Sequence, residues 1–359
     1  MTNKIYEILI IGAGPGGISM AAEARAEGVC KDAILVFDKA AEHSYVIRSM
    51  YPETKKVTAN FKGIKAVCHG AMCLPDTDKK GTISYLDKVI EKAGINVQYK
   101  EEIQKVKAVG TDKEPLFEVI STSGTYFGKT VIVAIGVFGK PNKPAYKLPA
   151  KLRKSIHFDV NSFRAENEKI LIVGGGDSAS EYAQYLSEFG NRLELSYRRD
   201  SFIRMNQVNN ESALLLEENG HMNILWNSNI EKVEVSDDKK PIVHFKEEDH
   251  GVKHYDRVVY ALGGSTPENF LSQIGIEFVG KDLQIDANHE SKTKGLFVAG
   301  DLASGKKGGS IVAAFNSSRI VMARICEQYI NCPDHTENNI HFDYHTLHFI
   351  DNEGHNLEE

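Results

Sequence analysis

Three glycines near the N-terminus and one acidic residue beyond them have the types and spacing of a dinucleotide site. Gly12, Gly14 and Gly17 follow the G-x-G-x-x-G pattern directly after the apolar run of residues 7–11. The first glycine permits a tight turn, the second lets a pyrophosphate approach the backbone, and the third lets the following helix pack on the strand. Asp38 stands 21 residues after Gly17, where a carboxylate can accept hydrogen bonds from ribose hydroxyls. We therefore expect a dinucleotide here, with its phosphates at a helix N-terminus.

A second glycine-rich stretch, about 160 residues further along, predicts a second nucleotide site. Gly174 and Gly176 repeat the spacing of the first two glycines, and Ala179 takes the third place. Asp177 and Ser178 stand at the expected start of the following helix, where they can contact a pyrophosphate and a ribose. Two such sites on one chain indicate one dinucleotide that stays bound and one that exchanges.

Arginine side chains stand where an acidic residue would be in the second site. Arg198 and Arg199 follow the predicted strand of residues 193–197, and Arg204 comes shortly after them. Guanidinium groups bind phosphate through paired, charge-assisted hydrogen bonds, so this cluster predicts a preference for NADPH over NADH. The alternative is that the three arginines form only a solvent-exposed charged surface.

The elements that must position these residues form two strand–helix–strand units. The first is predicted at residues 7–11, 15–27 and 33–38, and the second at 169–173, 177–188 and 193–197. Further strands are expected at residues 131–135, 258–262 and 295–301, and a helix at 310–329.

Glycine and proline after two of the short strands indicate where one domain is inserted in another. Residues 136–144 and 263–267 carry this pattern, and we expect them to be the two short linkers through which the chain leaves and re-enters the first domain. The predicted fold is α/β, with two Rossmann-like dinucleotide-binding domains. The predicted division is residues 1–140 and 265–330 for the first domain, 141–264 for the second, and 331–359 for a C-terminal tail.

Composition limits the function classes. The chain has 359 residues, 42% of them hydrophobic, with a net charge of −6, so no overall positive field favours nucleic acid or anionic lipid. No apolar stretch approaches the roughly 20 residues of a membrane span. Five cysteines without framework spacing predict a reducing, cytoplasmic environment, and the histidine-rich end lacks a recognised metal-ligand spacing.

The combination resembles the two-dinucleotide-domain flavoproteins of the low-molecular-weight thioredoxin reductase type, over residues 5–328. The resemblance implies FAD at the first glycine pattern, NADPH in the inserted domain, and a common homodimeric state. In that family a Gly-Asp motif touches the flavin ribityl chain, and the start of a following helix faces the flavin pyrimidine. The residues that the resemblance adds to the cofactor sites are Tyr51, Ile103, Gly136, Gly300, Asp301, Ser310 and Ile311.

One missing motif distinguishes the chain from the thioredoxin reductases. Those enzymes carry Cys-x-x-Cys shortly before the second glycine pattern, whereas residues 155–169 contain no cysteine. The chain is more similar to the ferredoxin or flavodoxin NADP reductases of this type, and closest to the flavodoxin:quinone reductase group of epsilonproteobacteria. This resemblance implies that Tyr51 stacks on the flavin and that the tail covers its other face, with Tyr344 and Phe349 as candidates.

The expected activity is hydride transfer from NADPH to FAD, followed by electron transfer to flavodoxin, ferredoxin or a quinone. Basic residues near the flavin edge are expected to bind an acidic carrier: Lys55, Lys56, Lys62, Lys306 and Lys307. Two enzymatic alternatives stay open. One is a low-molecular-weight disulfide reductase that uses Cys68 and Cys73, and the other is a flavin monooxygenase.

Overall fold

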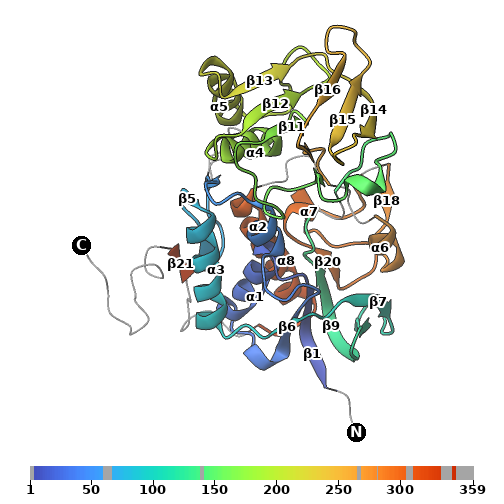
Figure 1. Cartoon of the computed structure of the whole chain (residues 1–359). Helices are drawn as coiled ribbons and strands as arrows, with labels where there is room; N and C mark the ends of the chain where they lie inside the picture. The colour runs from blue at the N-terminus through green and yellow to red at the C-terminus, as the bar shows by residue number, and fades with distance from the viewer. Residues whose placement is uncertain are drawn as a thin grey trace, which may run out of the picture. The chain divides into compact units, whose positions relative to one another are not determined.

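The computed structural model describes residues 4–59, 67–137, 141–264, 268–280, 282–304, 310–332 and 342–344 (Figure 1). The chain folds into two compact units. Unit 1 consists of residues 1–48, 56–138 and 266–359, and unit 2 of residues 49–55 and 139–265. The short segment 49–55 thus belongs with the second unit, whereas the sequence predicts that all of residues 1–140 belong to the first domain.

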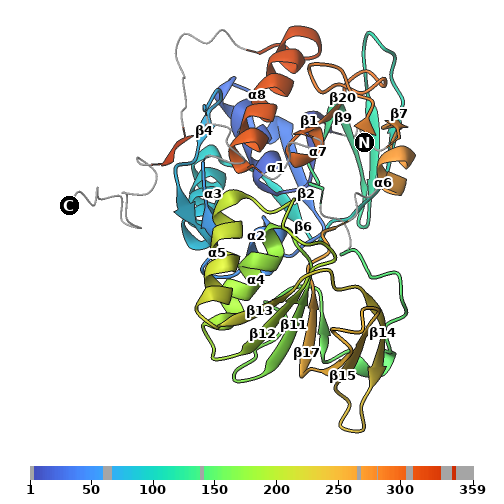
Figure 2. The ribbon, with the colours of Figure 1, turned by 90° about the horizontal axis from the view of Figure 1, so that it is seen from above.

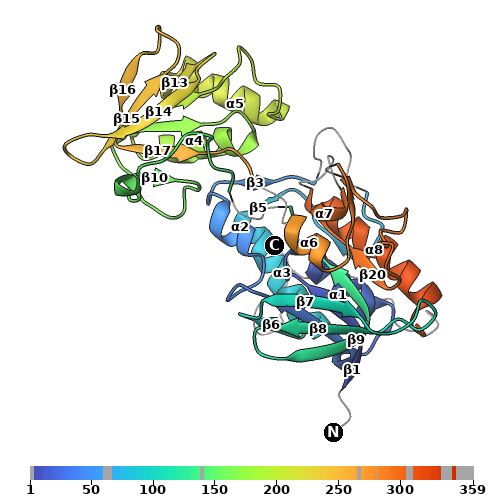
Figure 3. The same ribbon diagram turned by 90° about the vertical axis from the view of Figure 1, so that its right-hand side faces the viewer.

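Unit 1 is built on a seven-stranded sheet in the order β6-β2-β1-β9-β8-β7, with β20 also paired to β9. Parallel pairing joins β6, β2, β1, β9 and β20, and antiparallel pairing joins β7, β8 and β9, which lie side by side in Figure 3. The strands are β1 (Ile5–Ile11), β2 (Ile34–Asp38), β6 (Val97–Tyr99), β7 (Ile103–Ala108), β8 (Phe117–Ser121), β9 (Thr125–Val133) and β20 (Leu296–Val298).

Strand β1 lies between β2 and β9 in the sheet, and both of its faces are buried. Ile8 and Ile10 belong to the core cluster shared with helices α1 (Pro15–Ala26) and α8 (Ile311–Gln328), which lie side by side in Figure 2. Leu9 and Ile11 belong to the cluster on the other face. Side chains alternate across a strand, so a continuous apolar run fills both layers, as parallel sheets require. The glycines that follow β1 are therefore held by a strand with little freedom to move.

Unit 2 repeats the parallel arrangement with the strand order β10-β17-β11-β12-β13. Helices α4 (Asp177–Ser187) and α5 (Gln207–Glu218) pack against each other beside this sheet, and an antiparallel sheet of β14, β15 and β16 is formed by the sequence between β13 and β17. The strands are β10 (Ile156–His157), β11 (Lys169–Val173), β12 (Arg192–Ser196), β13 (Met222–Leu225), β14 (Ile230–Val235), β15 (Pro241–Phe245), β16 (Val252–His254) and β17 (Arg257–Tyr260).

The remaining elements are mostly short, apart from helix α3 (Lys79–Ala93) of unit 1. They are α2 (Tyr45–Met50), β3 (Lys56–Val57), β4 (Met72–Cys73), β5 (Thr77–Asp78), α6 (Glu268–Gln273), β18 (Phe278–Val279), β19 (Asp282–Leu283), α7 (Asp301–Ser304) and β21 (Phe342–Asp343), with 3-10 turns η1 (Lys31–Ala33) and η2 (Ala150–Leu152). No helix in the described part of the chain is long and apolar enough to cross a membrane.

The α/β fold with parallel sheets, predicted from the sequence, is confirmed. The strand at Lys169–Val173 has the expected bounds, and the other elements of the two strand–helix–strand units differ by one or two residues at an end. The antiparallel sheet of β14 to β16 was not predicted.

Candidate cofactor sites

The first glycine turn connects β1 to α1 and leaves room for a phosphate. A Cβ atom on Gly14 would meet nothing within 4 Å, whereas one on Gly17 would lie 1.8 Å from the carbonyl oxygen of Gly12. Gly17 is therefore required by close packing of helix on strand, and Gly14 faces open space. Gly14 is also the N-cap of α1, with Pro15 as the first helical residue, so no N-cap side chain competes for the first-turn amides. This turn fits a pyrophosphate.

Asp38, at the end of β2, supports this turn directly. Its Oδ2 accepts a hydrogen bond from the Ala13 N–H at 2.7 Å, and its Oδ1 accepts one from the Ala40 N–H at 2.8 Å. Each carboxylate oxygen keeps a second lone pair, so Asp38 can still accept hydrogen bonds from ribose hydroxyls. The Glu101 N–H donates to the Asp38 carbonyl oxygen at 2.8 Å, which brings the segment before Ile103 alongside Asp38.

The Gly-Asp motif lies against the same turn. Gly300 has a φ of +74°, and a Cβ on Gly16 would lie 2.9 Å from its Cα atom. The Gly300 N–H donates to Ser317 Oγ at 2.8 Å. Asp301 begins α7 directly after Gly300. The structure thus brings the motif of the β20 end into contact with the first glycine turn.

The predicted residues of the first site share one edge of the sheet in unit 1. The first glycine turn follows β1, Asp38 ends β2, Gly136 comes three residues after β9, and Gly300 comes two residues after β20. These four strands are parallel neighbours, so their carboxyl ends meet at the same edge, where α/β sheets bind ligands (Figure 1).

Ser310 and Ile311 stand at the start of α8. Ser310 is the N-cap, and its Oγ accepts a hydrogen bond from the Ala313 N–H at 3.2 Å. Ile103 is different, because its side chain is 6% exposed and belongs to the core. Any contact of Ile103 with a cofactor would therefore have to come from its backbone.

The sequence did not predict a buried histidine next to a residue that is hydrogen-bonded to the first glycine turn. The Ser44 N–H donates to the Ala13 carbonyl oxygen at 2.8 Å, and the adjacent His43 is 3% exposed. His43 Nε2 lies 2.6 Å from Asp87 Oδ1 and 2.7 Å from Arg48 Nη2. Burial lowers the pKa of His43, and hydrogen bonding to Asp87 opposes this only in part. A lone histidine in the sequence gives no signal of this network.

The second glycine turn connects β11 to α4 and also leaves open space. A Cβ on Gly176, the N-cap of α4, would meet nothing within 4 Å. The Asp177 side chain makes contacts that the sequence did not predict, because its Oδ1 accepts hydrogen bonds from the Asn206 N–H at 2.8 Å and from Asn209 Nδ2 at 3.2 Å. This carboxylate oxygen fixes the start of α4 to the start of α5. Ser178, the next residue, is half-buried.

The three arginines of the second site follow β12 and are all exposed. Among the described residues no carboxylate lies within ion-pair distance of Arg198, Arg199 or Arg204. The buried ring of Tyr197 anchors the backbone of this loop, with its centroid 5.3 Å from that of Phe202. Three unpaired guanidiniums after the strand end fit the binding of a phosphate group.

Tyr51 lies in the segment that belongs with unit 2, whereas the sequence places it in the first predicted domain. Asn161 Nδ2 donates to the carbonyl oxygens of Ser49 and Tyr51, at 2.5 Å and 3.2 Å. Lys55 Nζ lies 4.4 Å from the centroid of the Tyr51 ring and forms an ion pair with Glu181. The physical reason is that residues more than 100 positions away hold this segment, which no local pattern reveals. Lys55 is also already paired, which weakens its predicted role in carrier binding.

Four of the five cysteines form disulfides. Cys68 pairs with Cys73, and Cys326 pairs with Cys332, with Cα separations of 5.5 Å and 5.4 Å. Cys30 is free and exposed. Each pair spans only five or six positions, and no framework spacing in the sequence predicted these bonds.

The tail residue Tyr344 lies in unit 1, near α3. Its hydroxyl lies 3.0 Å from Thr77 Oγ1, and its ring centroid lies 5.4 Å from that of Tyr85. Several predicted residues lie outside the described part of the chain: Phe349, Lys62, Lys306 and Lys307. Among the described residues no group of three His, Cys, Asp or Glu side chains could hold a metal ion.

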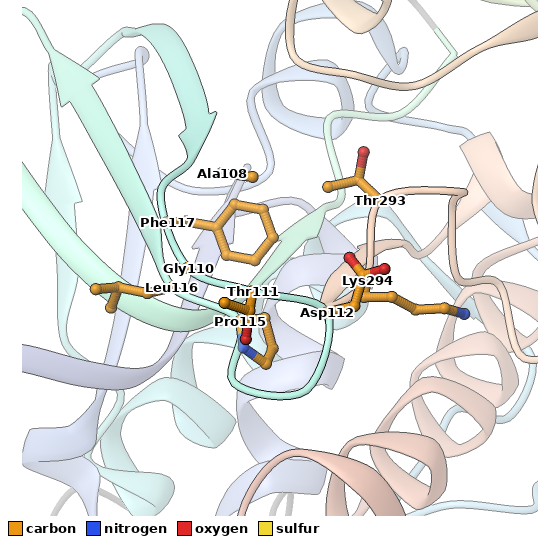
Figure 4. A pocket seen from close by; sticks show the side chains of 9 residues that line it. All are labelled: Ala108, Gly110, Thr111, Asp112, Pro115, Leu116, Phe117, Thr293 and Lys294. Carbon is orange, nitrogen blue, oxygen red and sulfur yellow. The ribbon is translucent and has the colours of Figure 1, made fainter.

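A small surface pocket of unit 1 is separate from the predicted residues. Figure 4 shows its lining, which comes from the turn between β7 and β8 and from the segment before β20. It includes Asp112, Pro115, Phe117 and Lys294 but none of the residues that the sequence assigned to a cofactor. We assign no function to it.

Comparison with known proteins agrees with the two glycine turns. Residues 9–300 match the sequence profile of the pyridine nucleotide-disulphide oxidoreductases. A ferredoxin–NADP reductase of Ignicoccus hospitalis is 27% identical over 86% of this chain and 93% of its own length. A ferredoxin–NADP reductase 2 of Bacillus mycoides is 20% identical over 84% and 86%.

Two solved structures show the same fold at low identity. The bacillithiol disulfide reductase of Bacillus cereus superimposes with a TM-score of 0.74 at 18% identity, covering 90% of this chain and 99% of that one. The thioredoxin reductase of Lactococcus lactis gives 0.70 at 20% identity, covering 90% and 98%. The predicted pair of Rossmann-like domains and the flavoprotein oxidoreductase class, with FAD and a pyridine nucleotide as cofactors, are thereby confirmed. The chain belongs to the pyridine nucleotide-disulphide oxidoreductase family.

Proposed function

We propose that the protein is an NADPH-dependent reductase of a ferredoxin or flavodoxin, with a quinone as a further acceptor. The observation that carries the proposal is the difference between its two glycine turns. The first has Asp38 at the end of the neighbouring strand, and the second has the unpaired arginines 198, 199 and 204 in the corresponding place. A carboxylate can accept hydrogen bonds from the unphosphorylated adenosine ribose of FAD, whereas arginines can bind the 2′-phosphate of NADPH.

The chain's own residues bind and orient the two cofactors. The first-turn amides of α1 bind the FAD pyrophosphate, while Asp38 accepts from its ribose hydroxyls. The first-turn amides of α4 bind the NADPH pyrophosphate, and Arg198 and Arg199 hold its 2′-phosphate. When bound, FAD accepts a hydride from NADPH and passes the electrons on singly or as a pair. Residues 136–144 and 263–267, of which 138–140 and 265–267 lie outside the described residues, are proposed hinges of the exchange between donor and acceptor access.

Three observations support a small electron carrier as the acceptor. The relatives of similar length are named ferredoxin–NADP reductases. Residues 155–169 lack the cysteine pair through which thioredoxin reductases act. Lysines 56, 306 and 307 stand near Tyr51 or the Gly-Asp motif in the sequence and are the proposed docking residues for an acidic carrier. A homodimeric state and a cytoplasmic location remain predictions.

A low-molecular-weight disulfide reductase is the second candidate, because Cys68 and Cys73 do form a disulfide. The superposition on a bacillithiol disulfide reductase adds only likeness of fold. In this alternative the pair would relay electrons from the flavin to a small disulfide, as family members with a redox-active pair do. No observation in the described part of the chain favours a monooxygenase.

An acceptor panel separates these functions. The FAD-loaded protein is reduced anaerobically with NADPH and then mixed with flavodoxin, ferredoxin, a quinone, a small disulfide or oxygen. We expect the protein carriers to be reduced fastest, at a rate that falls with ionic strength. Fastest turnover of the small disulfide, lost in Cys68→Ser, would overturn the proposal in favour of the disulfide reductase.

A further inference from the structure

The Cys68–Cys73 disulfide closes a ring of six residues. Strand β4 forms the last two residues of this ring. Ala71 and Met72 lie inside this ring and are buried, whereas the two cysteines are more accessible to solvent. Cys68 and Cys73 are half-buried, so the disulfide lies between solvent and the core, and we expect a small thiol to reach it.

The inner side of the ring is fixed to helices α1 and α8. The Ala71 N–H donates to Glu23 Oε1 at 2.5 Å, and Glu23 is 1% exposed. Asn316 forms hydrogen bonds with the residues on either side of Cys68. Its Oδ1 accepts from the His69 N–H at 3.0 Å, and its Nδ2 donates to the Val67 carbonyl oxygen at 2.8 Å. A Cβ on residue 70 would lie 1.8 Å from Glu23 Oε1, so any other residue there would require the Glu23 carboxylate to move.

Burial raises the pKa of Glu23 to about 7, although the hydrogen bond from Ala71 and the Arg319 guanidinium oppose the rise. Glu23 is therefore a buried acid that accepts a backbone hydrogen bond from the ring. A change in ring conformation would remove that partner from a side chain with almost no access to water.

The outer side of the ring pairs with residues 342–343. Strand β21 pairs in parallel with β4, and the Phe342 N–H donates to the Ala71 carbonyl oxygen at 2.8 Å. The Tyr85 hydroxyl accepts from the Cys73 N–H at 3.2 Å and donates to the Phe342 carbonyl oxygen at 2.5 Å. Phe342 is 0% exposed. The strand that receives the tail is thus made of ring residues.

We propose that Cys68 and Cys73 form a reversible thiol–disulfide modification site that controls the attachment of residues 342–344 to β4. A thiolate of a low-molecular-weight thiol attacks one sulfur, breaks the Cys68–Cys73 bond and forms a mixed disulfide. A second thiol then releases the attached group as the oxidised small disulfide, so two protein thiols form as two small thiols are oxidised. Opening the ring restores freedom to its residues and weakens the edge on which the tail pairs.

This site is distinct from the proposed electron transfer, because its reductant is a thiol from solution and it requires no electron from the flavin. Its test therefore needs neither NADPH nor an electron acceptor. The second disulfide of the chain, Cys326–Cys332, provides a matched control because it has nearly the same Cα separation.

The experiment measures amide hydrogen exchange at residues 342–344 in the full-length, FAD-loaded protein, with and without dithiothreitol. The double variant Cys326→Ser/Cys332→Ser leaves Cys68–Cys73 as the remaining disulfide of the described residues. In this variant we expect the reductant to accelerate exchange at Phe342 roughly 10- to 50-fold. The variant Cys68→Ser/Cys73→Ser should exchange fast whether or not dithiothreitol is added.

Two outcomes would overturn the proposal. One is exchange at Phe342 that is equal in the oxidised and reduced protein. The other is failure of millimolar dithiothreitol to expose Cys68 and Cys73 to an alkylating reagent in the folded protein. Tyr85→Phe provides an independent measurement, because it removes the hydroxyl bridge while keeping both sulfurs. We expect it to accelerate exchange at Phe342 with the disulfide intact, and unchanged exchange would count against the proposed attachment.

Discussion

Removing the arginines of the second site should abolish the preference for NADPH and leave NADH use intact. The perturbation is Arg198→Gln combined with Arg199→Gln. Each charge-assisted hydrogen bond to a phosphate contributes about 1.5–3 kcal/mol. Both side chains are exposed, so water and salt weaken the interaction and the lower value applies to each. The pair therefore contributes about 3 kcal/mol, which corresponds to a loss on the order of 100-fold in NADPH preference.

The assay is anaerobic rapid mixing of the FAD-loaded variant with NADPH or NADH, in which the limiting rate and the apparent Kd of flavin reduction are determined for each. The expected change is in the Kd for NADPH, with similar limiting rates. Arg192→Gln is the matched control, because Arg192 is also an exposed arginine but begins β12, whereas the cluster follows its end. Equal weakening of NADPH and NADH by the double variant, or the same effect in Arg192→Gln, would refute the reasoning.

The other predictions concern the two units separately. Gly17→Ala should lower the melting temperature and prevent FAD retention, because its Cβ would overlap the Gly12 carbonyl oxygen. Gly14→Ala should weaken FAD binding but leave the apoprotein stable, because its Cβ meets nothing. Differential scanning calorimetry of both variants checks the difference in stability. Glu23 has a pKa raised from 4.5 to about 7, so the folded state binds more protons than the unfolded one between these values, and stability should fall by about 3 kcal/mol as pH rises from 4.5 through 7. Urea unfolding across this range should show a flatter profile for Glu23→Gln, and an unchanged slope would disprove the assignment. Asn161→Ala should expose the peptide bond after Lys55 to trypsin, because it removes the amide that holds residues 49–55; unchanged cleavage kinetics would contradict this.

Local patterns were sufficient to predict the cores and the first glycine turn. The apolar run that ends in Ile11 could only be a strand buried on both faces, and the following glycines required a turn into a helix. Asp38 could be placed because its distance from that turn is set by the length of one helix and one strand. These features depend on periodicity and chain geometry, which the sequence displays directly.

Features that depend on distant partners were not accessible in the same way. Tyr51 belongs with unit 2 because of Asn161, a residue in an irregular segment with no recognisable motif. Asp177 was predicted to contact the nucleotide, and the residues that occupy its Oδ1 begin another helix about 30 positions later. The contact of Gly70 with Glu23, inside the ring that Cys68 and Cys73 close, also joins positions far apart in the sequence. Tertiary contacts of this kind require the fold.

The most direct test of the central claim is anaerobic titration of the purified, FAD-loaded protein with NADPH. The loss of the yellow flavin absorbance measures the reduction. We predict complete reduction by one equivalent of NADPH per FAD and a much weaker response to the same concentration of NADH. Purified protein that retains no FAD when it is supplied in excess, or flavin that NADPH fails to reduce, would contradict the account.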